Sequence, residues 1–535
     1  MLQRWKLRHF RLPDSGLVME LPPRVLFLKD NPLEVPKVFD PTPGSIAKVM
    51  HILIRHLSLA LFILGAAAAW NVPDEYAISP SPDGRFLRDA SGEPFFWQAD
   101  TAWLLFHRLN FTDAEQYLSH RASKGFTMVL AVGFTQEGIT NPNREGNLPF
   151  IDEDVTQPNE LYWAYVDTIV ELAWAKGLRI CMVPAWGNYV HDSANNPGVL
   201  NASAASTFGH FIGQRYPYLP KTLVADTNPL WLNKTAVKAD YTAGGVPPTY
   251  VSLDWSPVYN ALADGIVSGE HDAISATHNS SVSQTWTPLL TIHPTNQWFN
   301  PGPPALASAF FGNSTWLTLD TSQSGHADFP PNPPIPWWNA RRGWEPVERM
   351  WASGGRPAVD NEAHYEGRYD NGNSALPPWN ASDVRTGSWQ AVFSGAAGLT
   401  YGANAVMQFA IPGVYAPDGT GPGDNWLTDL ELPGSGQMQF VQKAVRDRGN
   451  ASYFQRVPAQ DIIVGDAGTD DKRVTATRDA AGGWVMVYTP TGKSFTINTG
   501  TLVSCDNAQA SWFSVGRTLH LTLIVGPLRF RLHRQ

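Results

Sequence analysis

The chain has little cysteine and little charge. Only Cys181 and Cys505 occur among its 535 residues, which excludes a scaffold built on disulfides. Because its neighbours are apolar, we expect Cys181 to be a small buried residue of a strand. Charged residues make up 16% of the chain, with 39 Lys+Arg against 48 Asp+Glu. This acidic balance argues against a nucleic acid as partner, since binding a phosphate backbone needs clustered cations.

The sequence also lacks an apolar run long enough to span a membrane. The core of residues 50–69 extends only from Leu57 to Ala69, whereas a spanning helix needs about 20 residues. Basic residues before this core and small residues before Trp70 are typical of a secretory signal peptide. We therefore expect a secreted, extracellular protein that has no stable membrane insertion after the signal is removed. Seven Asn-x-Ser/Thr sequons follow, which predicts a glycoprotein.

Residues 1–49 precede this signal, where further sequence is unusual. The stretch is rich in Pro and Arg and shows no periodicity. We interpret residues 1–49 as a disordered extension introduced by the gene model, with Met50 as the true start.

Aromatic residues are plentiful, with 21 Trp and 16 Tyr. Flat aromatic faces suit neutral polyhydroxylated ligands, although many Trp buried in a large core give the same composition. The composition by itself leaves these two interpretations open.

Apolar strands alternate with helical segments over residues 70–448. The predicted strands end near Ala99, Val132, Pro184, Ala225, Ile292, Leu319, Val359 and Tyr401. Because they are continuously apolar rather than alternating, they predict a parallel sheet covered on both faces. Eight such units predict an α/β protein with a TIM-type (β/α)8 barrel.

Short alternating strands in residues 449–535 predict a small antiparallel β-sandwich domain after the barrel. The last segment, 515–535, is basic and rich in Leu. It is either an edge strand or a misread splice junction, and we favour the second interpretation.

Two carboxylates stand at strand ends, Asp226 after the fourth strand and Glu362 after the seventh. In a barrel these ends face one another across the same mouth, so that a sugar fits between them. Carboxyls about 5–5.5 Å apart perform retaining glycoside hydrolysis, and a separation of about 6.5–9.5 Å leads to inversion. To act as an acid near neutral pH, Asp226 needs a raised pKa.

Other strand ends carry polar or aromatic groups suited to hydroxyl recognition. As substrate-binding candidates the sequence offers Asp100, Trp186, His293, Gln323, His326 and Tyr365. We predict no metal and no cofactor, because neither a His-Glu-x-x-His motif nor a Cys pair is present.

Several ordered motifs between about Arg85 and Arg448 resemble the apiosidase-like glycoside hydrolases, glycoside hydrolase family 140. They are Asp100-Thr-Ala-Trp103, Gly125-Phe126, Asn147-Leu-Pro-Phe150, Pro158-Asn-Glu-Leu-Tyr-Trp163, Val183-Pro-Ala-Trp-Gly187, Gln323-Ser-Gly-His326 and Asn361-Glu-Ala-His-Tyr-Glu-Gly367. The resemblance implies a TIM-like barrel and an exo-acting attack on a side chain of a plant pectic polysaccharide.

The resemblance also implies roles for the two carboxylates. The family's two catalytic carboxylates correspond to Glu362 and Asp226, and we predict that Glu362 is the nucleophile and Asp226 the general acid/base. The family shows Gly-Gly-Asp at the second position, whereas this chain reads Val224-Ala-Asp226. The C-terminal domain resembles a collagen-binding domain through Arg478-Asp479, Trp484, Tyr488-Thr-Pro490 and Ala510-Ser-Trp-Phe513.

The sequence therefore predicts a secreted, monomeric retaining glycosidase. A first alternative is a non-catalytic carbohydrate- or matrix-binding protein that keeps the barrel as a scaffold. A second is a metal-dependent barrel hydrolase, which needs at least three converging His or carboxylate ligands.

Overall fold

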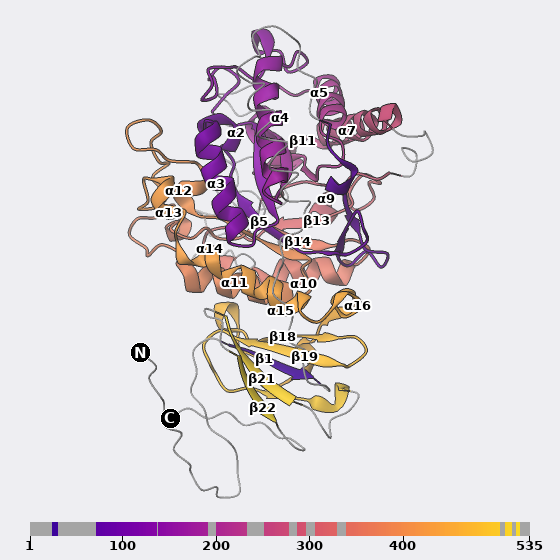
Figure 1. Cartoon of the computed structure of the whole chain (residues 1–535), viewed down its shortest axis with the longest axis vertical. Coiled ribbons are helices and arrows are strands. Elements are labelled where there is room, and N and C mark those ends of the chain that lie inside the picture. The colour runs from indigo at the N-terminus through magenta and orange to yellow at the C-terminus, as the bar shows by residue number, and fades with distance from the viewer. Residues whose placement is uncertain are drawn as a thin grey trace, which may run out of the picture. The chain divides into compact units, whose positions relative to one another are not determined.

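The computed structural model describes residues 24–29, 71–135, 137–190, 199–232, 251–277, 286–295, 305–328, 339–502, 509–515 and 520–524. The chain divides into two compact units (Figure 1). One unit is Glu34–Val457, and the other joins Met1–Leu33 to Pro458–Gln535. The expected signal peptide, residues 50–69, lies outside the described residues and stays a prediction.

The larger unit is built on parallel strands that alternate with helices along the chain. Its main sheet has the order β12-β8-β7-β6-β5-β15, with β9 paired to β7, and all of these pairings are parallel. A separate parallel pair is formed by β13 and β14. The bounds are β5 (Trp97–Thr101), β6 (Met128–Phe134), β7 (Arg179–Trp186), β8 (Lys221–Thr222), β9 (Val224–Ala225), β12 (Leu290–Thr291), β13 (Asp320–Gln323), β14 (Ala358–Glu362) and β15 (Gly398–Tyr401).

Backbone contacts connect the β13–β14 pair to both edges of the main sheet. Thr295, just after β12, forms a parallel bridge with Gln323 of β13. On the other side Ala397, just before β15, donates its N–H to Ala358 of β14 over 2.8 Å. The carboxyl ends of these parallel strands therefore meet at one end of the unit, where barrel enzymes carry their active sites.

The sixth strand begins where the apolar segment predicted for it ends. We expected residues 316–319, but the strand is β13, which reads Asp-Thr-Ser-Gln. Its buried polar groups find partners inside the fold: Ser308 donates its N–H to Asp320 over 2.9 Å, and Thr321 donates its hydroxyl to the Ile292 carbonyl over 2.5 Å. An apolar pattern cannot locate a strand whose buried side chains are polar and paired.

Helices follow the strands, and asparagine begins several of them. Asn110, Asn159, Asn201 and Asn380 each accept a hydrogen bond from a backbone N–H of the first turn, which satisfies one otherwise unpaired donor. The helices are α2 (Leu105–Arg108), α3 (Phe111–Ser123), α4 (Glu160–Ala175), α5 (Ala202–Arg215), α7 (Ser256–Thr277), α9 (Ala307–Phe311), α10 (Trp344–Ser353), α11 (Ala381–Phe393), α12 (Asn404–Met407), α13 (Trp426–Asp429), α14 (Pro433–Gln437), α15 (Gln439–Arg446) and α16 (Asn450–Phe454).

Helices α5 and α7 pack against each other through glycines. Gly209 and Gly213 of α5 face Gly265 and Gly269 of α7. A Cβ atom at Gly213 would lie 2.1 Å from the Ile266 carbonyl oxygen, so nothing larger than hydrogen fits there. The close approach of these backbones depends on the absence of side chains.

Short antiparallel strands complete the larger unit. They form one sheet from β2 (Ile78–Pro80), β3 (Leu87–Asp89) and β4 (Pro94–Phe95), and a pair from β10 (Leu230–Leu232) and β11 (Val251–Asp254).

The smaller unit contains antiparallel sheets, as the sequence predicted for this end of the chain. A six-stranded sheet has the order β16-β18-β19-β1-β21-β22, and β17 pairs with β20. The bounds are β16 (Arg456–Pro458), β17 (Ile463–Val464), β18 (Thr475–Asp479), β19 (Trp484–Thr489), β20 (Thr496–Ile497), β21 (Gln509–Ser514), β22 (His520–Ile524) and β1 (Arg24–Lys29). Apolar residues such as Val474, Val487 and Trp512 form its core.

Strand β1 comes from the stretch that we expected to be disordered. It pairs antiparallel with both β19 and β21. The rest of residues 1–49 lies outside the described residues, so the gene-model interpretation stays a prediction. Near the other end of the chain, β22 pairs with β21 at the edge of the sheet. Most of residues 515–535 lie outside the described residues, so both interpretations of that segment stay predictions.

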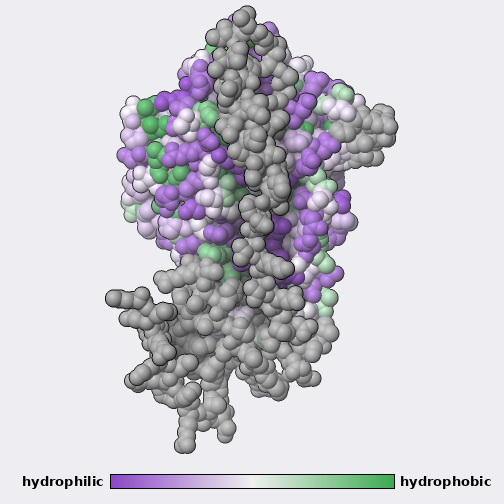
Figure 2. Space-filling view, viewed as in Figure 1, coloured by the Kyte–Doolittle hydropathy of each residue, from purple (hydrophilic) through white to green (hydrophobic). Residues whose placement is uncertain are grey.

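The part of the surface that Figure 2 colours is mainly hydrophilic. The large apolar side chains exposed among the described residues are Ile151, Leu161, Leu376, Val414, Leu427 and Val464. None of the helices in the described ranges has the length and apolar character needed to cross a membrane.

Candidate active site

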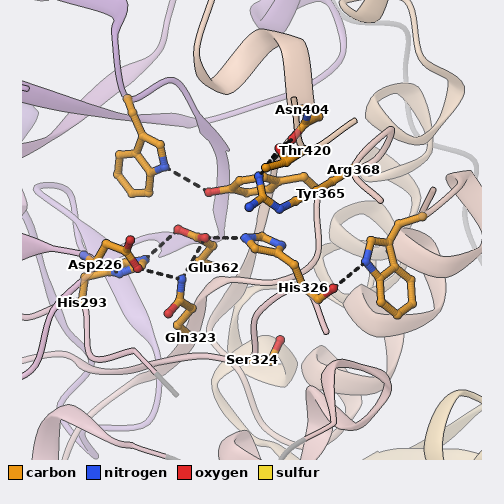
Figure 3. A network of polar contacts seen from close by, with 12 residues as sticks. Asp226, His293, Gln323, Ser324, His326, Glu362, Tyr365, Arg368, Asn404 and Thr420 are labelled. Carbon is orange, nitrogen blue, oxygen red and sulfur yellow. Dashed lines mark hydrogen bonds and ion pairs between the residues drawn. The ribbon is translucent and has the colours of Figure 1, made fainter. Parts of the chain in front are cut away.

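The two carboxylates selected from the sequence are brought together (Figure 3). Glu362 is the last residue of β14, and Asp226 directly follows β9. Figure 3 shows Gln323, from the end of β13, between their side chains. The site is therefore assembled from three strand ends that are far apart in the sequence.

Glu362 is held by three neighbouring side chains. Its Oε1 accepts hydrogen bonds from Gln323 Nε2 at 2.9 Å and from His326 Nε2 at 2.6 Å. Its Oε2 lies 3.3 Å from His293 Nε2. Burial alone would raise the pKa of Glu362, but the contacts from the two histidines hold that pKa well below its usual range. Glu362 is therefore a carboxylate, as a nucleophile must be.

Asp226 has the opposite electrostatic character. One side of the residue is open to solvent, but protein atoms crowd its carboxyl group. This loss of hydration, together with the negative charge of Glu362, raises the pKa of Asp226 above its usual value. The two carboxyls thus have their pKa values moved apart, the pattern that assigns acid and nucleophile in glycosidases.

One amide nitrogen limits the separation of the two carboxyls. Gln323 Nε2 lies 3.5 Å from Asp226 Oδ1 and 2.9 Å from Glu362 Oε1. Laid end to end, these two distances allow the oxygens to be at most 6.4 Å apart. The Gln323 –NH₂ group has two protons and can therefore donate one hydrogen bond to each carboxyl.

The two histidines have their pKa values moved in opposite directions. Burial and the nearby positive charge of Arg368 lower the pKa of His326 to about 4, so that ring is neutral near pH 7 and donates its Nε2–H to Glu362. Burial opposes the charge on His293, but its contact with Glu362 outweighs burial and raises its pKa. The N–H of Asp226 points at Nδ1 of His293 over 3.3 Å. In this arrangement the His293 proton is on Nε2, toward Glu362.

Aromatic residues close the remaining side of the site. The Tyr365 ring lies 4.3 Å from the His326 ring, and its hydroxyl accepts the indole N–H of Trp103 over 3.1 Å. Trp186, at the end of β7, is half-buried and meets the Trp103 ring edge-on at 5.7 Å. Trp103 therefore links Tyr365 and Trp186 on this side of the site.

Asp100 is placed differently from the other substrate-binding candidates. Its carboxylate is buried and accepts hydrogen bonds from Arg121 Nε and from the Tyr117 hydroxyl, both at 2.6 Å. These partners come from α3 on the helical layer, because Asp100 lies on β5 with its side chain turned toward that helix. The structure thus brings His293, Gln323, His326 and Tyr365 to Glu362, with Trp186 beside them, but not Asp100.

Sequence reasoning missed Trp103 and Arg368. Trp103 belongs to the Asp100-Thr-Ala-Trp103 motif, and attention to its aromatic end would have found it. Arg368 follows the Glu362 segment and donates to Thr420 Oγ1 at 2.7 Å and to Asn404 Oδ1 at 3.2 Å (Figure 3). Its positive charge lowers the pKa of His326, which no local sequence signal indicates.

The altered residues before Asp226 are ordinary strand residues. Val224 and Ala225 form β9 and are buried, and the positive φ, 52°, belongs to Asp226 itself. Gly187, which faces the segment that carries Asp226, must nevertheless be glycine, because a Cβ there would lie 2.7 Å from the Thr227 Cβ. The unusual backbone conformation is thus at Asp226, and the tight space is at Gly187, rather than at the two positions that lost glycine.

No cluster of three or more His, Cys, Asp or Glu placed to hold a metal ion occurs among the described residues. The Gln323 and His293 nitrogens around Glu362 contact the two carboxyls.

Comparisons with known proteins identify the family of this chain. A family model described as the apiosidase-like catalytic domain matches residues 81–451. A second, named for the collagen-binding domain of a collagenase, matches residues 457–521. No curated protein is similar enough to count as a match.

Two solved structures share the fold. A glycoside hydrolase family 5 protein from Bacteroides vulgatus is 24% identical, with a TM-score of 0.69 over 87% of this chain and 92% of that one. A structure described as a glycoside hydrolase is 25% identical, with a TM-score of 0.67 over 87% and 95%. The chain therefore belongs to the apiosidase-like glycoside hydrolases and is a glycosidase.

Proposed function

We propose that this glycosidase works with retention of configuration, with Glu362 as nucleophile and Asp226 as general acid/base. The observation that carries the proposal is the single Gln323 nitrogen that reaches both carboxyls, which limits the distance between Asp226 Oδ1 and Glu362 Oε1 to 6.4 Å. This limit is below the range of about 6.5–9.5 Å that leaves room for an inverting water.

In the first step, Asp226 gives its proton to the glycosidic oxygen while Glu362 attacks the anomeric carbon. The bond between that carbon and the oxygen breaks, the alcohol leaves, and a glycosyl ester forms on Glu362. In the second step, Asp226 takes a proton from water, whose oxygen attacks the same carbon and releases Glu362. The raised pKa of Asp226 and the lowered pKa of Glu362 favour these starting protonation states.

We propose a plant pectic side chain as the substrate, attacked in the exo direction, because the family implies it. The half-buried Trp186 offers an aromatic face beside Asp226 for a sugar ring, since β7 and β9 pair Trp186 with Ala225. Because Asp226 and Glu362 are both present and lie close together, we favour an enzyme over the alternative of a non-catalytic binding protein.

The test is a screen of plant cell-wall oligosaccharides with the wild type and with Glu362→Gln. Sugar release by the wild type and its loss in Glu362→Gln is expected, and the first-formed anomer, followed by nuclear magnetic resonance, should keep the configuration of the substrate. Release that survives Glu362→Gln would remove that residue from its role, and a first product of inverted configuration would refute retention.

We propose that the parallel strands close into a full (β/α)8 barrel, that the smaller unit is a β-sandwich, and that the protein is a secreted monomer cleaved after residues 50–69. N-terminal sequencing of secreted protein tests the cleavage, and a start well before residue 60 would contradict it.

A further inference from the structure

The Tyr365 hydroxyl lies between an indole and the proposed nucleophile. Trp103 Nε1 donates to this hydroxyl over 3.1 Å, and Figure 3 shows the hydroxyl beside the carboxylate of Glu362. Both aromatic residues are buried, 3% and 2% exposed. A phenol has one proton, and its oxygen here receives the proton of Trp103. The phenol proton is therefore directed to Glu362.

Packing fixes the Tyr365 ring in this position. The ring lies so close to Gly402 that a Cβ there would be 2.2 Å from its Cδ1 atom. His326 packs on it with ring centroids 4.3 Å apart. The Trp103 ring is held in turn by His293, which it meets at 90° and 5.5 Å. Rotation of the Tyr365 or Trp103 ring would therefore disturb the packing of His326 or His293.

We propose that Trp103 is a positioning residue: its indole N–H fixes the direction of the Tyr365 O–H, so that Tyr365 supports the negative charge of Glu362 before attack and after ester hydrolysis. This inference rests on the proposed function of Glu362. Burial and the charge of Glu362 raise the pKa of Tyr365 well above its usual value, so the phenol keeps its proton at any working pH. A donor aligned in advance costs no reorganisation when the carboxylate charge returns.

The test compares Trp103→Phe, Tyr365→Phe and the double variant in the full chain, on the sugar substrate found in the screen. Trp103→Phe keeps an aromatic ring and removes only the N–H. Trp103→Phe should lower kcat/KM about three- to tenfold, the worth of one neutral hydrogen bond, and Tyr365→Phe should lower it further, because its phenol faces a charged carboxylate. In both, the acidic limb of the pH profile should move to higher pH, because Glu362 loses support for its charge. The double variant should be no worse than Tyr365→Phe.

Trp97→Phe is the matched control. Trp97 is also buried in the larger unit and donates its N–H to a hydroxyl, Thr400 Oγ1, over 3.2 Å. Its loss should affect stability to a similar degree but leave the acidic limb unchanged. The proposal is overturned if the effects of Trp103→Phe and Tyr365→Phe multiply in the double variant, or if Trp103→Phe leaves the acidic limb where the wild type has it.

A measurement without substrate separates this inference from the proposed function. In protein labelled with ¹⁵N-tryptophan, the Trp103 indole N–H signal should shift on Tyr365→Phe and, through the phenol, on Glu362→Gln. This holds even if the screen releases no sugar or Trp103→Phe does not fold. If no indole signal is displaced by both substitutions, the pairing is refuted.

Discussion

The backbone N–H of Asp226 donates to Nδ1 of His293 over 3.3 Å. The opposite nitrogen of the same ring lies 3.3 Å from Glu362 Oε2. One imidazole thus contacts the backbone of the proposed acid and the carboxylate of the proposed nucleophile. Asp226 adopts φ 52°, a conformation that costs a non-glycine residue about 1 kcal/mol. The hydrogen bond to His293 helps to offset that cost.

His293→Phe should therefore disturb both carboxyls at once. It keeps a ring against Trp103 but removes both nitrogens, so the pKa of Glu362 should rise and the Asp226 backbone should lose its acceptor. We expect kcat to fall about a hundredfold, and the acidic limb of the pH profile to move upward. Steady-state kinetics against pH measure both. An unchanged acidic limb would show that His293 does not govern the charge of Glu362.

The pH dependence of kcat/KM should be bell-shaped. Activity needs Glu362 ionised, so it rises as pH increases through the lowered pKa of Glu362. It also needs Asp226 protonated, so it falls as pH increases through the raised pKa of Asp226. Asp226→Asn should reduce the rate by about 10²–10⁴-fold and remove the alkaline limb. A persisting alkaline limb in Asp226→Asn would assign it to another group.

Gly187→Ala should impair catalysis through the segment that carries Asp226. The new Cβ would meet the Thr227 Cβ at 2.7 Å and the Ala225 carbonyl oxygen at 2.8 Å, so this segment must move. We expect kcat to drop at least tenfold, because displacements of about 1 Å at a reacting group are costly. Gly436→Ala is the control, since only Lys124 Cδ, at 3.8 Å, lies near its Cβ. Equal kinetics for the two variants would contradict the expectation.

Asp100→Asn should act on stability rather than on substrate binding. It leaves the buried Arg121 without its carboxylate, which typically costs about 3–5 kcal/mol. We expect a lower midpoint of urea unfolding and, in the folded fraction, an unchanged KM. A raised KM at unchanged stability would restore Asp100 to the substrate-binding group that the sequence suggested.

Gly213→Ala should separate α5 from α7. The methyl group would lie 2.1 Å from the Ile266 carbonyl oxygen, and relieving this overlap should cost about 1–3 kcal/mol. Ser203→Ala on the exposed face of α5 is the control and should change stability by less than about 0.5 kcal/mol. Thermal unfolding compares them; equal midpoints would mean that the helices can shift freely.

Sequence patterns located the strand ends better than the strands themselves. Polar residues that follow an apolar run, such as Glu362 and Asp226, were identified because barrel chemistry occurs at such positions. The predicted position of the sixth strand was wrong, because the buried residues of β13 are polar. Gln323, at the end of β13, was nevertheless identified as a candidate. Hydrogen bonds across the fold satisfy those residues, and no local pattern encodes such partners.

The sequence by itself determined the alternation of strands and helices, the two carboxyls, and most of the polar groups around Glu362, because apolar runs and their ends are local features. Only the tertiary structure decided that Asp100 turns to Arg121 on α3, that Gln323 reaches both carboxyls, and that Trp103 reaches Tyr365. In a continuously buried strand both faces look alike, so the direction of each side chain depends on partners that are distant in the chain. The same partners move the pKa values of Asp226 and Glu362 apart, since burial and neighbouring charges exist only in the folded state.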